Sequence, residues 1–69
     1  MKEYCKKIKD LRVESGFTIK ETAKKLGISP KTYSNYEKGI SKIPIRQLIS
    51  ICLLYNVSAD YILGLKKRE

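Results

Sequence analysis

The ionisable side chains of this sequence set the chemistry that is open to it. Histidine, the commonest general base of enzymes, is absent, and the seven Asp and Glu residues are scattered without visible pairing. The two cysteines, Cys5 and Cys52, are too few for a closed tetrahedral metal site when no histidine can complete it. We therefore expect neither an enzyme nor a bound metal or other cofactor.

Lysine and arginine are the most numerous ionisable residues. They total 15 against 7 acidic residues, which gives a net charge of +8. This excess favours an anionic partner, with nucleic acid ahead of an anionic membrane surface. The longest apolar run, residues 51–55, falls far short of the ~20 residues of a membrane-spanning helix, and no secretory signal pattern follows Met1. We expect a cytoplasmic protein that does not enter membranes.

The first part of the chain contains two segments of helical periodicity. Apolar residues recur at helical spacing over residues 2–15, and Gly16 can end this helix in the left-handed conformation. Thr18 and Glu21 have the spacing of a capping box, in which each side chain accepts a hydrogen bond from the backbone amide of the other residue. A second helix therefore begins there and runs to about Leu26.

A third helix follows almost at once. Ser29 and Pro30 are an N-cap residue followed by a proline at the first helical position, and the helix runs from Pro30 to about Lys38, before Gly39. Only residues 27–29 separate it from the preceding helix, so the chain must turn sharply. This spacing predicts a helix-turn-helix connection.

Two more helices are expected near the end of the chain. Pro44 introduces the first, which ends at Asn56 and carries apolar residues along one stripe. Ser58 caps the second, which ends at Gly64. The predicted stripe consists of Ile45, Leu48, Ile49, Cys52 and Tyr55.

The fold class follows from these segments. No segment alternates as a strand does, and 69 residues support only one core. We predict an all-α single domain of five short helices over residues 1–69, with a core from about residue 8 to 64 and a basic tail at 66–69. Four of the five tyrosines fall at helical core spacing, which favours packing of their rings in the core over stacking of the rings on the bases of single-stranded nucleic acid. Both cysteines lie on apolar stripes, which favours packing over redox sensing.

Between Leu11 and Gly64 the sequence resembles the lambda-repressor-like family of helix-turn-helix proteins, also called the Cro or xenobiotic-response-element type. The resemblance implies a compact five-helix domain in which the third helix enters the major groove of DNA. It rests on the order and spacing of Leu11-Arg12, Gly16-Phe17-Thr18, Glu21-Thr22-Ala23, Leu26-Gly27-Ile28-Ser29, residues 32–39, Pro44 and residues 57–64.

The resemblance also implies which residues contact DNA bases. Lys31 could donate to guanine, Asn35 could pair with adenine, and Thr32 could contact a thymine methyl group or a phosphate. The hydroxyls of Thr32 and Ser34 could instead simply face solvent. The positions carried over from the family are Pro30, Lys31, Thr32, Ser34 and Asn35.

Phosphate contacts in the family come from the start of the second helix and from the loop after the third. One departure is Ile19, where the family usually has a glutamine that reaches a phosphate; Lys20 or a backbone amide would have to replace it. A second departure is Thr22, where a larger aliphatic residue is common. The carried-over positions are Thr18, Ile19, Lys38, Ser41 and Lys42.

Arg12 lies on or beside the apolar stripe of the first helix. An unpaired guanidinium would be costly there, although the residues alone leave a solvated Arg12 open. The resemblance implies an ion pair with Glu37 that has a structural role and ties the first helix to the third.

Three functions remain to be weighed. The first is a transcriptional regulator, in particular a repressor, that binds a pseudo-palindromic operator in double-stranded DNA as a homodimer. The candidate dimer interface consists of Tyr61, Ile62 and Leu65, unless these residues only close the core. The second is an antitoxin or anti-regulator that binds another protein, for which Ile19, Ile40 and Ile43 near the same surface leave room. The third is association through charge alone.

Overall fold

Five helices follow one another in the structure, a computed structural model that describes residues 3–65. No strand is present within this range, so the all-α prediction is confirmed. Residue 2, which we predicted to be helical, and the basic tail at 66–69 lie outside the described residues. None of the described helices is long and apolar enough to cross a membrane. The helices are α1 (Glu3–Glu14), α2 (Ile19–Leu26), α3 (Pro30–Lys38), α4 (Ile45–Tyr55) and α5 (Ala59–Leu63).

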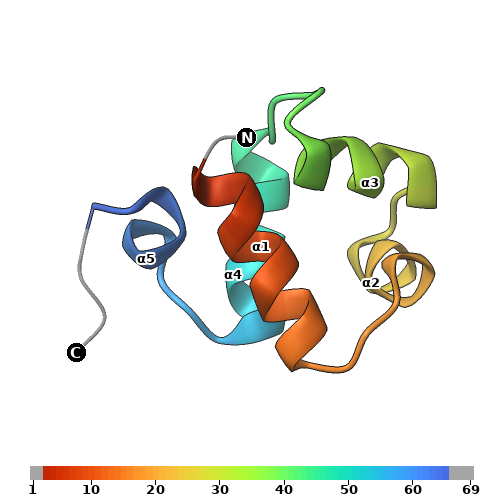
Figure 1. Cartoon of the computed structure of the whole chain (residues 1–69), viewed down its shortest axis with the longest axis horizontal. Coiled ribbons are helices and arrows are strands. Elements are labelled where there is room, and N and C mark those ends of the chain that lie inside the picture. Colours follow the sequence, from red (N-terminus) through yellow and green to blue (C-terminus); the bar gives the residue numbers. More distant parts are fainter. Residues whose placement is uncertain (1–2, 66–69) are drawn as a thin grey trace.

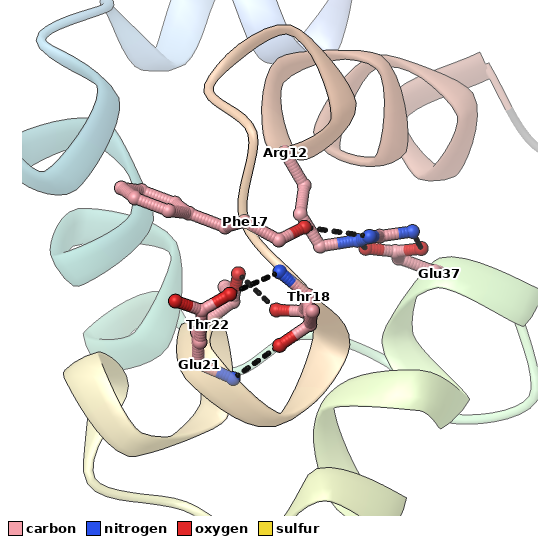
Figure 2. Close-up of polar contacts among 6 residues, drawn as sticks. All are labelled: Arg12, Phe17, Thr18, Glu21, Thr22 and Glu37. Atoms are coloured by element: carbon pink, nitrogen blue, oxygen red, sulfur yellow. Dashed lines mark hydrogen bonds and ion pairs between the residues drawn. The ribbon is translucent and has the colours of Figure 1, made fainter.

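The predicted helix caps are present. The Thr18 hydroxyl accepts from the Glu21 amide at 3.0 Å, and the Glu21 carboxylate accepts from the Thr18 amide at 2.9 Å, which confirms the capping box (Figure 2). The hydroxyls of Ser29 and Ser58 cap α3 and α5 by accepting from the amides of Thr32 and Tyr61, without a reciprocal bond. These caps fix where the short helices begin, because an N-cap oxygen satisfies an amide that has no partner inside the helix.

The five helices surround one small core (Figure 1). Figure 1 shows α1 crossing the middle of the molecule, with α2 and α3 to one side and α5 to the other. α1 packs against α3 and α5, whereas α4 packs against α2 and α5. Each helix contributes at least one core side chain without accessible surface, and burying a large aliphatic side chain stabilises the fold by about 1.5–3 kcal/mol. These residues are Ile8, Ala23, Tyr33, Ile51 and Ile62.

The predicted apolar stripe of α4 is partly wrong. Leu48, Cys52 and Tyr55 do pack against the core, but Ile45 and Ile49 are 76% and 54% exposed. The fully buried residue of α4 is instead Ile51, which the predicted stripe left out. Because aliphatic residues lie on almost every side of this helix, its periodicity alone did not select the side that packs against α2 and α5.

The predicted interface residues of the last helix also need a correction. Ile62 has no accessible surface, so it belongs to the core and cannot contact a second copy. Tyr61 is half-buried against the core, and Leu65 is 75% exposed. Both cysteines pack as predicted: Cys5 is fully buried, and burial raises the pKa of the partly buried Cys52 thiol, which disfavours the reactive thiolate.

Candidate nucleic-acid interface

The connection between α2 and α3 fixes how these two helices cross. Gly27 ends α2 with a left-handed backbone, at φ 73°, a conformation that a residue with a side chain adopts only with strain. The Ile28 amide donates to the carbonyl of Ala23 at 3.0 Å, and Ala23 is fully buried between the helices. The small side chain of Ala23 allows a close approach. One side of α3 is therefore held against the domain, and its opposite side is left open.

The buried side of α3 carries Tyr33, Tyr36 and Glu37. The residues predicted to contact bases all lie outside this buried set. They belong to α3, which begins directly after the helix-turn-helix connection. Pro30 and Lys31 are exposed, and Thr32, Ser34 and Asn35 are half-buried.

Thr32 differs from its neighbours because its hydroxyl is already engaged. It lies 2.8 Å from the Ser29 hydroxyl, which also accepts from the Thr32 amide at 3.1 Å. The Thr32 hydroxyl therefore has one local partner, and its remaining hydrogen-bonding capacity and its methyl group are left for a ligand. Within residues 3–65, no hydrogen bond holds the side chains of Lys31, Ser34 or Asn35, so these groups can reorient toward a ligand.

The start of α2 supplies backbone donors in place of the absent glutamine. The Ile19 side chain packs against the core, so it makes no polar contact with a phosphate. As the first two residues of α2, Ile19 and Lys20 have amides without a partner inside the helix, and the Lys20 side chain is exposed beside them. The Thr18 hydroxyl accepts from the Glu21 amide and also carries one O–H donor of its own. The groups here that could bind a phosphate are therefore the amides of Ile19 and Lys20, the Lys20 ammonium and the Thr18 hydroxyl.

The loop after α3 carries the remaining predicted phosphate contacts. The amides of Ile40 and Ser41 both donate to the carbonyl of Asn35, at 3.0 and 3.3 Å, and this holds the first turn of the loop in place. Ser41 is half-buried, whereas Lys38 and Lys42 are exposed. The two lysines thus lie on either side of a fixed turn at the end of α3.

Exposed acidic residues are absent from the part of the chain that carries α3 and the loop after it. Between residues 22 and 59 the sequence has one carboxylate, Glu37, and its side chain is only 6% exposed. The exposed acids of α1 and α5 are Glu3, Asp10, Glu14 and Asp60. The open side of α3 and the loop after it therefore present cations without a competing exposed carboxylate.

Arg12 neutralises Glu37 from inside the domain (Figure 2). Its Nε donates to Glu37 Oε2 at 2.7 Å, its Nη2 donates to Glu37 Oε1 at 3.2 Å, and its Nη1 donates to the Phe17 carbonyl at 2.9 Å. The hydrogen bond to Glu37 raises the pKa of Arg12 further. The structure thus brings the two predicted partners together, and the guanidinium joins α1, the turn before α2 and the end of α3.

Three further hydroxyl groups lie on the inner side of the site. The Thr22 hydroxyl donates to the carbonyl of Thr18 at 3.0 Å, which explains how a polar side chain is tolerated at this fully buried position. Burial raises the pKa of the Tyr33 and Tyr55 hydroxyls, so both remain neutral at ordinary pH. The charge on this inner side is consequently carried by Arg12 and Glu37.

Two lysines have contacts that the sequence did not predict. Lys7 Nζ donates to the Tyr61 carbonyl at 2.9 Å and lies 5.1 Å from the centroid of the Tyr61 ring. Lys25 Nζ lies 5.0 Å from the centroid of the Phe17 ring. Lys7 and Tyr61 are 54 residues apart, so no local spacing signals their contact. Both lysines hold elements of the domain together, in addition to contributing positive charge.

Comparison with known proteins agrees with this geometry. A sequence profile of the helix-turn-helix family matches residues 8–62. An uncharacterized HTH-type transcriptional regulator of Bacillus subtilis (strain 168), YobD, is 40% identical over 62 residues, which are 90% of this chain and 55% of the relative. The HTH-type transcriptional regulator ImmR of the same organism is 42% identical over 59 residues, 86% of this chain and 46% of the relative.

A third relative, the HTH-type transcriptional regulator AnsR of Bacillus subtilis (strain 168), is 29% identical over 63 residues, 91% of this chain and 54% of the relative. This chain therefore spans about half the length of the curated relatives that it matches. No solved structure gave a significant match. The profile match, the relatives and the α2–α3 geometry together place this chain in the helix-turn-helix family, in its lambda-repressor-like branch.

Proposed function

We propose that this chain recognises specific sequences in double-stranded DNA and regulates transcription. The observation that carries the proposal is the charge around α3: the one carboxylate between residues 22 and 59 is buried against Arg12, and the exposed charges are cations. The phosphate backbone of duplex DNA is a polyanion that fits such a surface. The names of the three relatives, all HTH-type transcriptional regulators, support the same function.

The proposed contacts fall into two classes. Lys31, Ser34 and Asn35 on the open side of α3 read base edges in the major groove, with the Thr32 methyl group and Pro30 in apolar contact. The backbone amides at the start of α2, together with Thr18, Lys20, Lys38, Ser41 and Lys42, hold the phosphates on either side. The first class gives specificity, and the second gives affinity and orientation.

We further propose that the regulator is a homodimeric repressor on a pseudo-palindromic operator. One small module contacts too few base pairs to mark a single genomic address. Two recognition helices about 34 Å apart would read successive major grooves on one side of the duplex. A bound dimer would then block access to the DNA it covers.

Salt-dependent titration tests the proposed function. The protein is titrated with a duplex enriched from random sequences by repeated rounds of binding, and separately with unselected duplex. The enriched duplex should bind roughly 10³-fold tighter or more, and log affinity should fall with log salt by about 0.9 for each phosphate neutralised. Equal affinity for the two duplexes would leave charge alone as the basis of binding and would overturn sequence-specific regulation.

A second candidate function is binding to another protein, as an antitoxin or anti-regulator does. Ile40, which is 70% exposed in the loop after α3, favours this function because it adds an apolar side chain beside the cationic residues. Ile43 and Ile19 give weaker support for binding to a protein, because both side chains pack against the core. The same titration separates the two functions, because a module that acts only on protein does not discriminate between duplexes.

A further inference from the structure

An open hollow of about 260 Å³ lies where three helices and one loop meet. It is lined by Tyr4 of α1, by Leu48 of α4 and by Leu63 of α5, and the loop after α3 adds Lys42 and Ile43. A cavity of roughly 150 Å³ can hold a benzene ring, so the hollow has room for a short alkyl chain or a small ring.

The lining of this hollow combines apolar side chains with one cation. Four of the five lining residues are aliphatic or aromatic, and Lys42 is the one that carries a charge. Lys42 is exposed, and within residues 3–65 no carboxylate forms an ion pair with it. Small-molecule sites have this composition, with apolar walls and a few polar groups that fix the orientation of the ligand. A ligand with an apolar body and one anionic end complements both parts of the lining.

We propose that the hollow binds a small carboxylate with an apolar tail, and that this ligand weakens the grip of the chain on DNA. The tail lies against Ile43, Leu48 and Leu63, and the carboxylate pairs with the Lys42 ammonium. The effect on DNA rests on the proposed function, in which Lys42 holds a phosphate. The binding of the ligand itself does not.

Lys42 belongs both to the hollow and to the loop that faces DNA. An ammonium that pairs with a carboxylate in the hollow cannot neutralise a phosphate at the same time, so the ligand and DNA compete for one side chain. By linkage, each then weakens the binding of the other by the same factor. The turn before Lys42 stays in place, because the amides of Ile40 and Ser41 remain bonded to the Asn35 carbonyl. The ligand therefore lowers affinity without changing which bases are read.

The size and charge of the hollow define the probe. Octanoate has an unbranched tail and one carboxylate, whereas acetate lacks the tail and octan-1-ol lacks the charge. Each methylene that leaves water should tighten binding by at most about fourfold. Affinity should therefore rise from butanoate to octanoate and level off for longer chains, once the hollow is filled.

The first test locates the ligand without DNA. In an NMR titration with octanoate, the amide signals of Ile43, Leu48 and Leu63 should shift and that of Val13 should not. Acetate and octan-1-ol should shift the same signals far less. Leu63→Glu, at a 46% exposed position in the lining, places a like charge beside the carboxylate and should abolish the shifts at Ile43 and Leu48. Val13→Glu, at a 59% exposed position on α1, is the matched control and should bind octanoate as the unaltered protein does. Shifts spread over the whole chain, or equal binding by both variants, would overturn the inference.

The second test measures the competition with DNA at constant sodium concentration, with acetate replacing octanoate in the reference. Saturating octanoate should weaken the enriched and the unselected duplex by the same factor and reduce the slope of the salt dependence by about 1. Lys42→Ala should already show both changes, and octanoate should have no further effect on it. Lys38→Ala removes the lysine on the other side of the turn, which does not line the hollow, and should stay as sensitive to octanoate as the unaltered protein. Full sensitivity of Lys42→Ala, or octanoate bound in the hollow with no loss of DNA affinity, would refute the competition.

These outcomes are separable from the proposed function. Octanoate bound in the hollow of a chain that binds all duplexes equally would refute sequence-specific recognition and leave the ligand site intact. Specific DNA binding by a chain whose hollow takes up no octanoate would refute the ligand site and leave DNA recognition intact.

Discussion

Arg12 shows how one side chain can couple three segments of a small domain. Its guanidinium contacts both carboxylate oxygens of Glu37 and the carbonyl of Phe17. The Arg12 and Glu37 side chains are only 13% and 6% exposed, so each group depends on the other to offset the cost of leaving water. The same pair removes a carboxylate charge from α3 that would repel a phosphate.

We predict a strong coupling between the two residues of this pair. Glu37→Gln should lower the free energy of unfolding by about 3 kcal/mol, because the buried guanidinium of Arg12 loses its counter-charge. Arg12→Met should cost a similar amount, since it leaves the carboxylate unpaired. The double variant should cost clearly less than the sum of the two, as measured by urea denaturation. Strictly additive losses would mean that the pair contributes nothing as a pair.

A second prediction at the residue scale separates base contacts from phosphate contacts. Asn35→Ala should weaken binding to the enriched duplex by ~1–3 kcal/mol and leave binding to unselected duplex almost unchanged. Lys42→Ala should weaken binding to both duplexes alike and reduce the slope of the salt dependence by about 1. Competitive gel-shift titrations at several salt concentrations measure both effects. Identical behaviour of the two variants would refute the division into two classes of contact.

At the scale of helices, local sequence signals predicted the positions of the elements well. The capping box at Thr18 and the cap at Ser29 fixed the starts of α2 and α3, because both depend on residues within a few positions of one another. The side of α4 that packs inward was not predictable in this way. Aliphatic residues lie all around α4, and the choice between Ile51 and Ile45 depends on α2 and α5, which pack against it from other parts of the chain.

The same distinction between local and tertiary signals applies to the candidate site. The positions of Lys31, Ser34 and Asn35 followed from the register of α3. The engagement of the Thr32 hydroxyl and the inward packing of Ile19 required the folded arrangement, since each depends on which neighbouring group lies within contact distance. Sequence spacing thus located the site, and tertiary contacts determined which atoms of it remain available.

The capping box of α2 gives a prediction for the dependence of stability on pH. Hydrogen bonds from the Thr18 amide and hydroxyl lower the pKa of Glu21 below its ordinary value. A lowered pKa in the folded state means that the ionised carboxylate stabilises the fold above its unfolded pKa, and that this contribution is lost as the pH falls through the folded pKa. Stability should therefore decline on the acid side, between about pH 5 and pH 3.

Glu21→Gln is the matched variant for this prediction. Glutamine retains the capping-box geometry but does not titrate in this range. The stability advantage of the unaltered protein over Glu21→Gln should therefore shrink as the pH falls, when both are followed by thermal or urea unfolding. A difference that stays constant from about pH 6 to pH 3 would show that the carboxylate charge at this cap has no role in stability.

At the scale of the whole molecule, charge and apolar surface are segregated. The charged side chains exposed on α3 and on the loop after it are all cations, most of the exposed acids lie on α1 and α5, and α4 has one charged residue, Arg46. This segregation assigns an anionic partner to the face formed by α3 and the loop after it.

The proposed homodimer predicts a periodic dependence of DNA affinity on the spacing of the half-sites. A dimer with a fixed two-fold geometry can place both α3 helices in the major groove only when the half-sites are about 10 base pairs apart or a multiple of this distance. Inserting about 5 base pairs turns the second half-site to the opposite side of the duplex and should weaken binding roughly 10²-fold, to the affinity of a single half-site. Gel-shift titration of the two spacings measures the effect. If the affinity did not depend on the spacing, the two copies would be joined flexibly or not at all, and a fixed homodimer would not set the geometry of recognition.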